Sequence, residues 1–154
     1  MRLTVNRFIE VTIMKDIDQI FDDLSSMNSE EVQARGIEAA RQIKHLTVLI
    51  MPLMNKPIWY NCAKVIAEKS DEELKPYFML LLRWLQDFNW PGADIIYDRL
   101  LEVNDESFID DYRISLSMAQ KSGDRPWEAA LNDFGIDYEK RHTGVKDMRG
   151  HEVQ

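Results

Sequence analysis

Carboxylate pairs are the residues of this sequence whose spacing could support chemistry. Asp94 and Asp98 are four residues apart, which places both side chains on one face of a helix. Two carboxylates on one face could bind a cation, or act as a general acid and a general base. Solvated helix faces carry such pairs very often, however, and the sequence favours that interpretation. We therefore predict no catalytic residue and no enzymatic activity.

The sequence also lacks the residues of a metal, cofactor or nucleophile site. Such sites need clustered His or Cys ligands, a glycine-rich phosphate loop or a nucleophile motif such as Gly-x-Ser-x-Gly. The three histidines are scattered along the chain, and Cys62 is the only cysteine. Cys62 falls on the apolar side of a predicted helix, which is typical of a small buried hydrophobic residue. No metal and no cofactor are expected.

The charge balance narrows the possible partners. The 154 residues include 19 Lys and Arg against 27 Asp and Glu, a net charge of -8. A field of that sign repels nucleic acid and anionic lipid, and it favours either a cationic partner or plain solubility. The longest apolar run, 48–54, contains Pro52 and is far shorter than the ~20 residues that span a bilayer. A single cysteine suits a reducing compartment, so we expect a cytoplasmic protein that binds neither nucleic acid nor membrane.

Helix boundaries recur along the chain. Pro57 and Pro91 are 34 residues apart, and Pro126 follows 35 residues later. Proline is tolerated in the first turn of a helix, where its missing N–H group would be unpaired anyway. Short polar residues followed by acids, a helix-capping pattern, recur at 28–31, 70–73 and 104–106. A period near 34 with two helices per unit indicates a helical repeat. The predicted fold is all-α, with antiparallel helix pairs stacked as a short α-solenoid.

We predict three regions along the chain. Residues 1–14 form an N-terminal arm or a short strand, residues 15–139 the helical repeat domain, and residues 140–154 a flexible, polar C-terminal tail. Gly135 is expected to stop the last helix. Apolar periodicity predicts helices over 16–24, 29–46, 57–69, 70–88, 91–103, 105–121 and 126–134.

The run Leu82-Arg-Trp-Leu-Gln-Asp-Phe-Asn-Trp-Pro-Gly-Ala93 resembles the hallmark of a bacterial family catalogued only as domain of unknown function 5071. The resemblance covers roughly residues 28–134 and implies a HEAT- or armadillo-like fold. It implies no substrate, cofactor or catalytic residue. Turn chemistry explains the hallmark residues without any function. Asp87 would bond the turn backbone, Asn89 would cap the next helix, and the remaining hallmark residues would pack and orient it: Trp84, Trp90 and Pro91.

The repeat register aligns residues of the two Pro-started helices. Tyr60 aligns with Asp94 and Lys64 with Asp98, on outward faces. Equivalent positions of stacked helix pairs form a ladder along one surface. The ladder predicts a polar and aromatic contact patch, and an ordinary solvated face is the alternative. The patch comprises Tyr60, Asn61, Lys64, Asp94, Tyr97 and Asp98.

A helical repeat without catalytic motifs typically presents a surface to a partner. We therefore predict a non-catalytic protein-interaction module with a protein partner. Its small size and acidity motivate a specific hypothesis, an immunity-type protein that neutralises a basic toxin. The alternative is a small-ligand binder or an enzyme that uses a groove between helices, lined by Trp59, Trp90 or Trp127. The partner's identity and the oligomeric state stay open.

Overall fold

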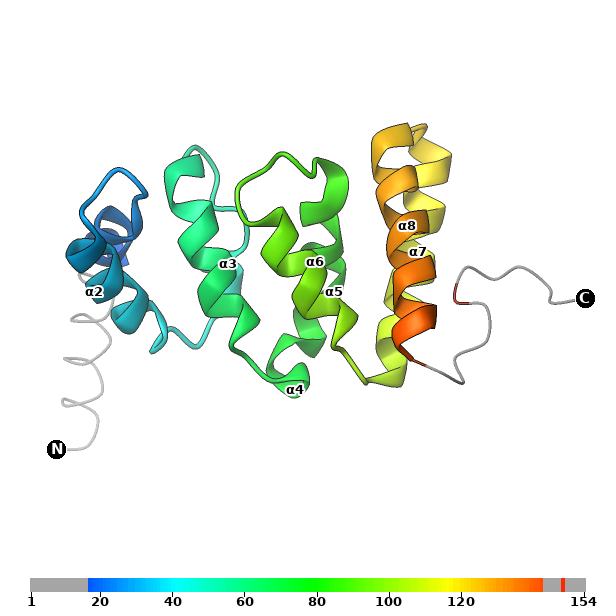
Figure 1. The fold of residues 1–154 in the computed structure, drawn as a ribbon, viewed down its shortest axis with the longest axis horizontal. Coiled ribbons are helices and arrows are strands. Elements are labelled where there is room, and N and C mark those ends of the chain that lie inside the picture. The colour runs from blue at the N-terminus through cyan, green and yellow to red at the C-terminus, as the bar shows by residue number, and fades with distance from the viewer. Residues whose placement is uncertain (1–16, 143–147, 149–154) are drawn as a thin grey trace, which may run out of the picture.

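The fold is all-α. A computed structural model of the protein describes residues 17–142 and Met148, and within these residues it contains helices and no strand. The predicted N-terminal arm, 1–14, lies outside the described residues. Figure 1 shows the helices standing side by side in a row, so the prediction of stacked helix pairs forming a short solenoid is confirmed.

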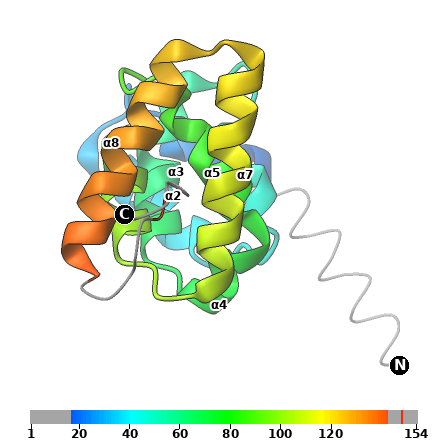
Figure 2. The same ribbon diagram turned by 90° about the vertical axis from the view of Figure 1, so that its right-hand side faces the viewer.

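The helices form two layers. One layer contains, in order, α2 (Glu30–Ala40), α3 (Trp59–Ala67), α6 (Ala93–Leu101) and α8 (Arg125–Arg141), each packed on the next. The other layer contains α5 (Phe78–Arg83) and α7 (Glu106–Ser122), which also pack on each other. The end-on view separates α8 from α7 and α5 (Figure 2). A one-turn 3₁₀ helix, η1 (Leu46–Leu49), packs on α3 where the other units have a longer helix.

Side-chain caps begin the helices where the sequence predicts them. The Ser29 hydroxyl accepts a hydrogen bond from the N–H of Val32 at the start of α2. At α4 (Asp71–Leu74), Ser70 and Glu73 form a capping box, in which each side chain accepts from the other's backbone N–H. Such caps satisfy N–H groups that have no partner within the helix. Asp105 begins α7 in the same way.

Two predicted helices are shorter than expected. The helix predicted over 29–46 ends at Ala40, because the chain turns there and buries Leu46 and Leu49 of η1 against α3. The helix predicted over 70–88 is divided into α4, η3 (Lys75–Tyr77), α5 and η4 (Trp84–Gln86). Pro76 lies in η3, and proline lacks the N–H group that a continuous α-helix requires and clashes with the preceding turn.

The last helix is longer than expected. Gly135 does not stop it. The helix α8 has 17 residues in all, Arg125–Arg141, and Gly135 is buried within it. One glycine costs a helix only about 1 kcal/mol, and Tyr138 beyond it is buried with its hydroxyl donating to the carbonyl of Val103 at 2.6 Å. The predicted tail therefore begins inside α8. Beyond α8, only His142 and Met148 of that tail are described, and Met148 is buried.

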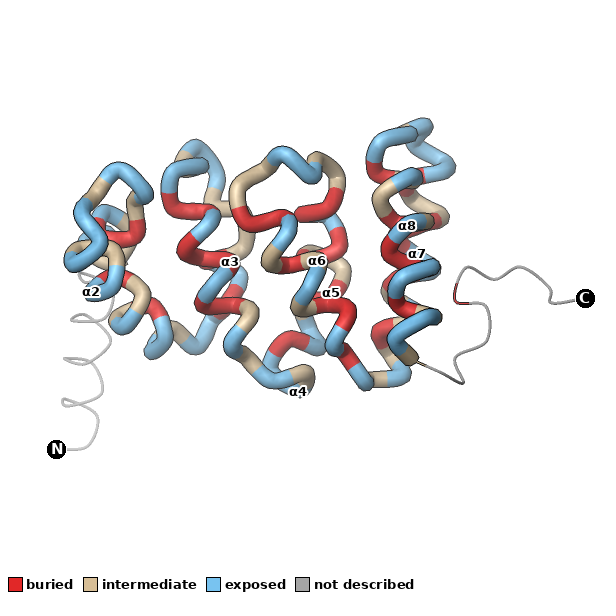
Figure 3. Tube along the Cα trace, in the orientation of Figure 1, coloured by how far each residue is buried: buried red, intermediate tan, exposed pale blue. Residues whose placement is uncertain are grey.

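The core lies between the two layers. Buried positions recur along every helix of the stack (Figure 3). At the C-terminal end, an aromatic cluster joins α7 to α8, and its members are Phe108, Tyr112, Phe134 and Tyr138. Each helix pair added to the stack buries a face of the preceding pair that would otherwise be exposed. Within the described residues, no helix combines the length and apolar character needed to cross a membrane.

Candidate functional site: a groove between α6 and α8

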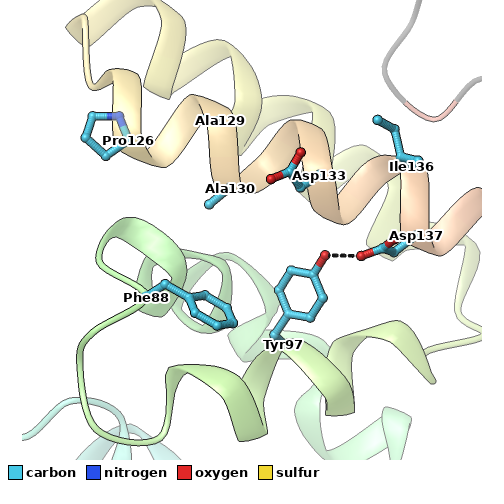
Figure 4. Close-up of a pocket in the computed structure, with 8 residues that line it drawn as sticks. All are labelled: Phe88, Tyr97, Pro126, Ala129, Ala130, Asp133, Ile136 and Asp137. Atoms are coloured by element: carbon cyan, nitrogen blue, oxygen red, sulfur yellow. Dashed lines mark hydrogen bonds between the residues drawn. The ribbon is translucent and has the colours of Figure 1, made fainter.

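A groove of about 510 Å³ runs between α6 and α8. Figure 4 shows the rings of Phe88 and Tyr97 side by side below α8, with Asp137 of α8 next to the Tyr97 hydroxyl and Asp133 one turn earlier on the same helix. The groove is open to solvent, so a ligand could enter without a rearrangement of the backbone. Its lining residues are Phe88, Tyr97, Pro126, Ala129, Ala130, Asp133, Ile136 and Asp137.

The sequence of α8 forms one wall of this groove. Pro126, Ala130, Asp133 and Asp137 recur at intervals of three or four residues, which places them on one helix face. Ala129 and Ala130 are the smallest side chains of this wall, so they leave room between α8 and the aromatic rings opposite. The wall changes from apolar at the start of α8 to acidic further along it.

The opposite wall depends on a tight turn after η4. The Asp87 carboxylate accepts from the N–H of Asn89 at 2.9 Å, and the carbonyl of Asp87 accepts from the N–H of Trp90 at 3.0 Å. Gly92 follows in the left-handed region with φ +83° and starts α6. The turn leaves Phe88 52% exposed, with its ring 5.6 Å from that of Tyr97. The turn and the Tyr97 ring therefore position the exposed ring of Phe88.

Tyr97 joins the two walls. Its hydroxyl donates to Oδ2 of Asp137 at 2.5 Å, and its ring packs edge-on against Phe134 at 5.2 Å. The pKa of this hydroxyl lies well above its usual value, first because the group is partly buried and then because of the bond to Asp137. The negative charges of Asp137, Asp133 and Asp98 act in the same direction. The charges of these three carboxylates thus favour the neutral form of Tyr97.

These carboxylates have no cationic partner within the part of the chain that the structure describes. Asp94, Asp98, Asp133 and Asp137 are all exposed, and none of them forms an ion pair there. Other exposed acids of the same layer are paired, for example Glu68 with Arg41 and Glu102 with Arg141. The region around α6 and α8 therefore carries uncompensated negative charge beside exposed aromatic rings.

Not all residues of the predicted contact patch are exposed. Tyr60 and Lys64 are exposed on α3, with the Lys64 ammonium 4.7 Å from the centre of the Tyr60 ring. α3 packs directly on α6, so these residues and the exposed Asp94 and Asp98 belong to neighbouring helices of one layer. Asn61 is buried, however, and its amide donates to the carbonyl of Leu24 at 2.8 Å. Asn61 is therefore a packing residue, and its place in the patch was a wrong prediction.

The hallmark residues support the turn between η4 and α6. The indole N–H of Trp84 donates to the carbonyl of Pro91 at 3.0 Å, and the Trp90 ring packs edge-on against Trp59 at 5.6 Å. Asp87 bonds the turn backbone, but Asn89 does not cap α6, because Gly92 occupies the cap position without a side-chain bond. The motif positions Phe88 and begins α6.

The tryptophans proposed for a ligand groove do not line the groove between α6 and α8. Trp59 and Trp127 are buried, and their indole N–H groups donate to the carbonyls of Pro52 and Leu82. The residues missed from the sequence are Phe88, Asp133 and Asp137. A last helix that ends before Gly135, as predicted, does not contain Asp137. The spacing of Asp133 and Asp137, four residues apart, is the sequence signal that places them on one helix face.

The described ranges, 17–142 and Met148, show no cluster of metal-ligating side chains. No group of three or more His, Cys, Asp or Glu side chains there could hold a metal ion. His142 stacks on Tyr138, with ring centres 3.9 Å apart. Cys62 is fully buried, and burial raises the pKa of its thiol to about 12.

We expect the Cys62 thiol to be unreactive in the native protein. Only the thiolate reacts with alkylating reagents, and both burial and the raised pKa keep it scarce. Alkylation with iodoacetamide at pH 8 should be at least about a hundredfold slower in the native state than in urea. Mass spectrometry of timed samples measures both rates. Comparable rates would place Cys62 at an accessible surface and contradict the packing of α3.

Comparisons with known proteins identify a matching family. A family model described as "Domain of unknown function (DUF5071)" matches residues 54–150. No curated protein and no solved structure matches the chain. The matched range contains the turn at 87–92, α6 and α8, and therefore both walls of the groove.

Proposed function

The chain belongs to the DUF5071 family, and we propose that it is a non-catalytic protein-interaction module that binds a basic protein partner. The family description assigns no activity, so the proposal rests on the surface. Helical repeats use the side-by-side arrangement of equivalent helices to present an extended surface. Here that surface spans α3, α6 and α8.

One observation carries the proposal. Four exposed aspartates on α6 and α8 have no ion-pair partner in the described part of the chain, and two of them, Asp133 and Asp137, line the groove with Phe88 and Tyr97. We call this surface the acidic face. It comprises Phe88, Asp94, Tyr97, Asp98, Asp133 and Asp137, and the neighbouring α3 adds Tyr60 and the cationic Lys64. Aromatic rings supply contact area at low entropic cost, and uncompensated carboxylates favour a cationic partner.

A more specific version follows from size and charge. We propose that the chain is an immunity-type protein that neutralises a basic toxin in the cytoplasm, a role that its net charge of -8 would favour. Electrostatic complementarity would give fast association and would exclude acidic competitors. We also propose that the fold is related to HEAT or armadillo repeats and that the protein is located in the cytoplasm.

Charge reversal on the acidic face tests the proposal. The tagged full chain would capture proteins from a lysate of its native host at moderate salt, with mass spectrometry of the retained proteins. The Asp94→Lys/Asp98→Lys variant should lose the retained basic partner by at least about tenfold, because two attractions become repulsions. The matched control is Asp18→Lys/Asp22→Lys, an exposed pair with the same spacing on the helix at 17–24.

The control variant should keep the partner, because it changes the net charge by the same amount at a distant helix. Circular dichroism would establish that both variants fold. A partner that is retained equally by the wild type and by Asp94→Lys/Asp98→Lys would remove the acidic face as the binding surface. Equal losses in both variants would reduce the effect to net charge.

A small-ligand binder is the second candidate. The groove volume of about 510 Å³ lies within the range of small-molecule sites, about 300–1,000 Å³. A thermal-shift screen of metabolites against the full chain tests it. A rise in melting temperature that Phe88→Ala abolishes would support a small ligand, and its absence would favour the protein partner.

A further inference from the structure

The groove offers an aromatic surface and an acidic end. Phe88 exposes about half of its side chain, and its ring lies edge-to-face with Tyr97. On the other wall, Asp133 and Asp137 of α8 line the same groove, and Asp137 lies next to the Tyr97 hydroxyl (Figure 4). A planar cation with several N–H donors could contact both walls at once.

The apolar part of the groove would suit an aliphatic stem. Pro126, Ala129, Ala130 and Ile136 line it together with the rings. Long basic side chains bury their methylene groups on apolar surface while their charged ends reach polar groups. The groove therefore matches a side chain that is apolar along its length and cationic at its end.

We propose that this groove receives an arginine side chain of the protein partner, with the guanidinium against the Phe88 ring and hydrogen-bonded to Asp133 and Asp137. The inference rests on the proposed function and names the partner residue that the acidic face would recognise. The Asp137 carboxylate already accepts from the Tyr97 hydroxyl through Oδ2, and its other oxygen is available to a guanidinium donor.

Arginine fits this groove better than other ligands. A guanidinium is planar, stacks on aromatic rings and pairs with carboxylates through two parallel bonds, whereas a lysine ammonium is a strongly hydrated point charge. Phosphate and carboxylate ligands would be repelled by Asp133 and Asp137, which line the groove. Within the described residues, no cation of the chain itself pairs with these aspartates.

A pair of tripeptides tests the groove directly. The probes are acetyl-Gly-Arg-Gly-amide and the same peptide with citrulline, which has nearly the same shape and no charge. NMR of the full chain labelled at alanine methyl groups would follow Ala129 and Ala130. We expect saturable shifts of both methyls with the arginine peptide, with a dissociation constant on the order of 1 mM.

Three comparisons decide the result. Citrulline should bind at least about tenfold more weakly, and so should Asp133→Asn/Asp137→Asn, because each change removes the charge attraction at the acidic end. Asp18→Asn/Asp22→Asn, a distant pair with the same spacing, should bind like the wild type. Equal binding of both peptides, equal losses in both variants, or no saturable shift of Ala129 and Ala130 would overturn the inference.

The two proposals fail in different ways. If partner capture depends on Asp94 and Asp98 while the groove ignores arginine, the inference is overturned and the proposed function stands. If the groove binds the arginine peptide but the chain captures no partner, the proposed function is overturned, and with it the assignment of that arginine to a protein.

Discussion

Gly92→Ala is expected to lower the free energy of unfolding by about 3 kcal/mol, through backbone strain and overpacking together. Gly92 has φ +83°, where a residue with a Cβ is strained by about 1 kcal/mol. A Cβ at this position would lie 2.5 Å from the Cβ of Ala63 and 3.1 Å from the carbonyl oxygen of Trp59. Both contacts belong to α3, so α6 would have to move away from its neighbour.

Gly123→Ala is the matched control for this prediction. Gly123 also has a positive φ, +71°, but a Cβ there would meet nothing within 4 Å. It should therefore cost only the backbone strain, about 1 kcal/mol. Urea unfolding followed by circular dichroism measures both variants. Equal destabilisation would mean that the close contact of α3 and α6 at Gly92 does not limit the fold.

Phe134→Ala is expected to cost about 4 kcal/mol. The Phe134 side chain is fully buried, and its ring is surrounded by aromatic neighbours at 5.2–6.0 Å: Tyr97, Phe108, Tyr112 and Tyr138. Its removal loses the transfer free energy of a large ring and leaves a cavity that rigid aromatic neighbours cannot fill. Since small domains are stable by only about 5–15 kcal/mol, this loss would remove a large fraction of the stability.

Phe88→Ala provides the contrast for Phe134. Its ring also contacts Tyr97, but about half of the side chain is exposed, so we expect a cost below about 1 kcal/mol. The same urea experiment compares the two variants. If Phe88→Ala were as destabilising as Phe134→Ala, Phe88 would be part of the core, and its availability to a ligand would be contradicted.

Local signals in the sequence were enough to predict the helix starts. Ser29, Ser70 and Asp105 lie in the predicted capping sites, and each accepts from a backbone N–H one turn ahead or less. Capping depends on residues three or four apart, so it can be read without the rest of the fold. Helix ends depend on more. Pro76 interrupts the helix predicted over 70–88, because a continuous α-helix needs the N–H group that proline lacks.

The remaining differences come from contacts between distant residues. Leu46 leaves the helix expected over 29–46 because η1, which contains it, is buried against α3. Tyr138 extends α8 past Gly135 because its hydroxyl bonds Val103, 35 residues away. The spacing of apolar residues indicates which face of a helix is buried, but it does not indicate which other element packs on that face.

The site was predicted in part for the same reason. The repeat register placed Tyr60, Lys64, Asp94 and Asp98 on neighbouring helices, and all four are exposed there. Asn61 is next to Tyr60 in sequence but points the other way, to the carbonyl of Leu24. The groove joins Tyr97 to Asp137, 40 residues further along, and such a contact exists only in the packed molecule.

The most direct test of the acidic face is hydrogen exchange of the chain with its captured partner bound. Mass spectrometry of peptic peptides would compare the free and bound chain. We predict protection of the turn at 87–92, α6 and α8, and no change along the exposed side of α7, which belongs to the other layer. Protection confined to α7, with α6 and α8 unchanged, would contradict the account.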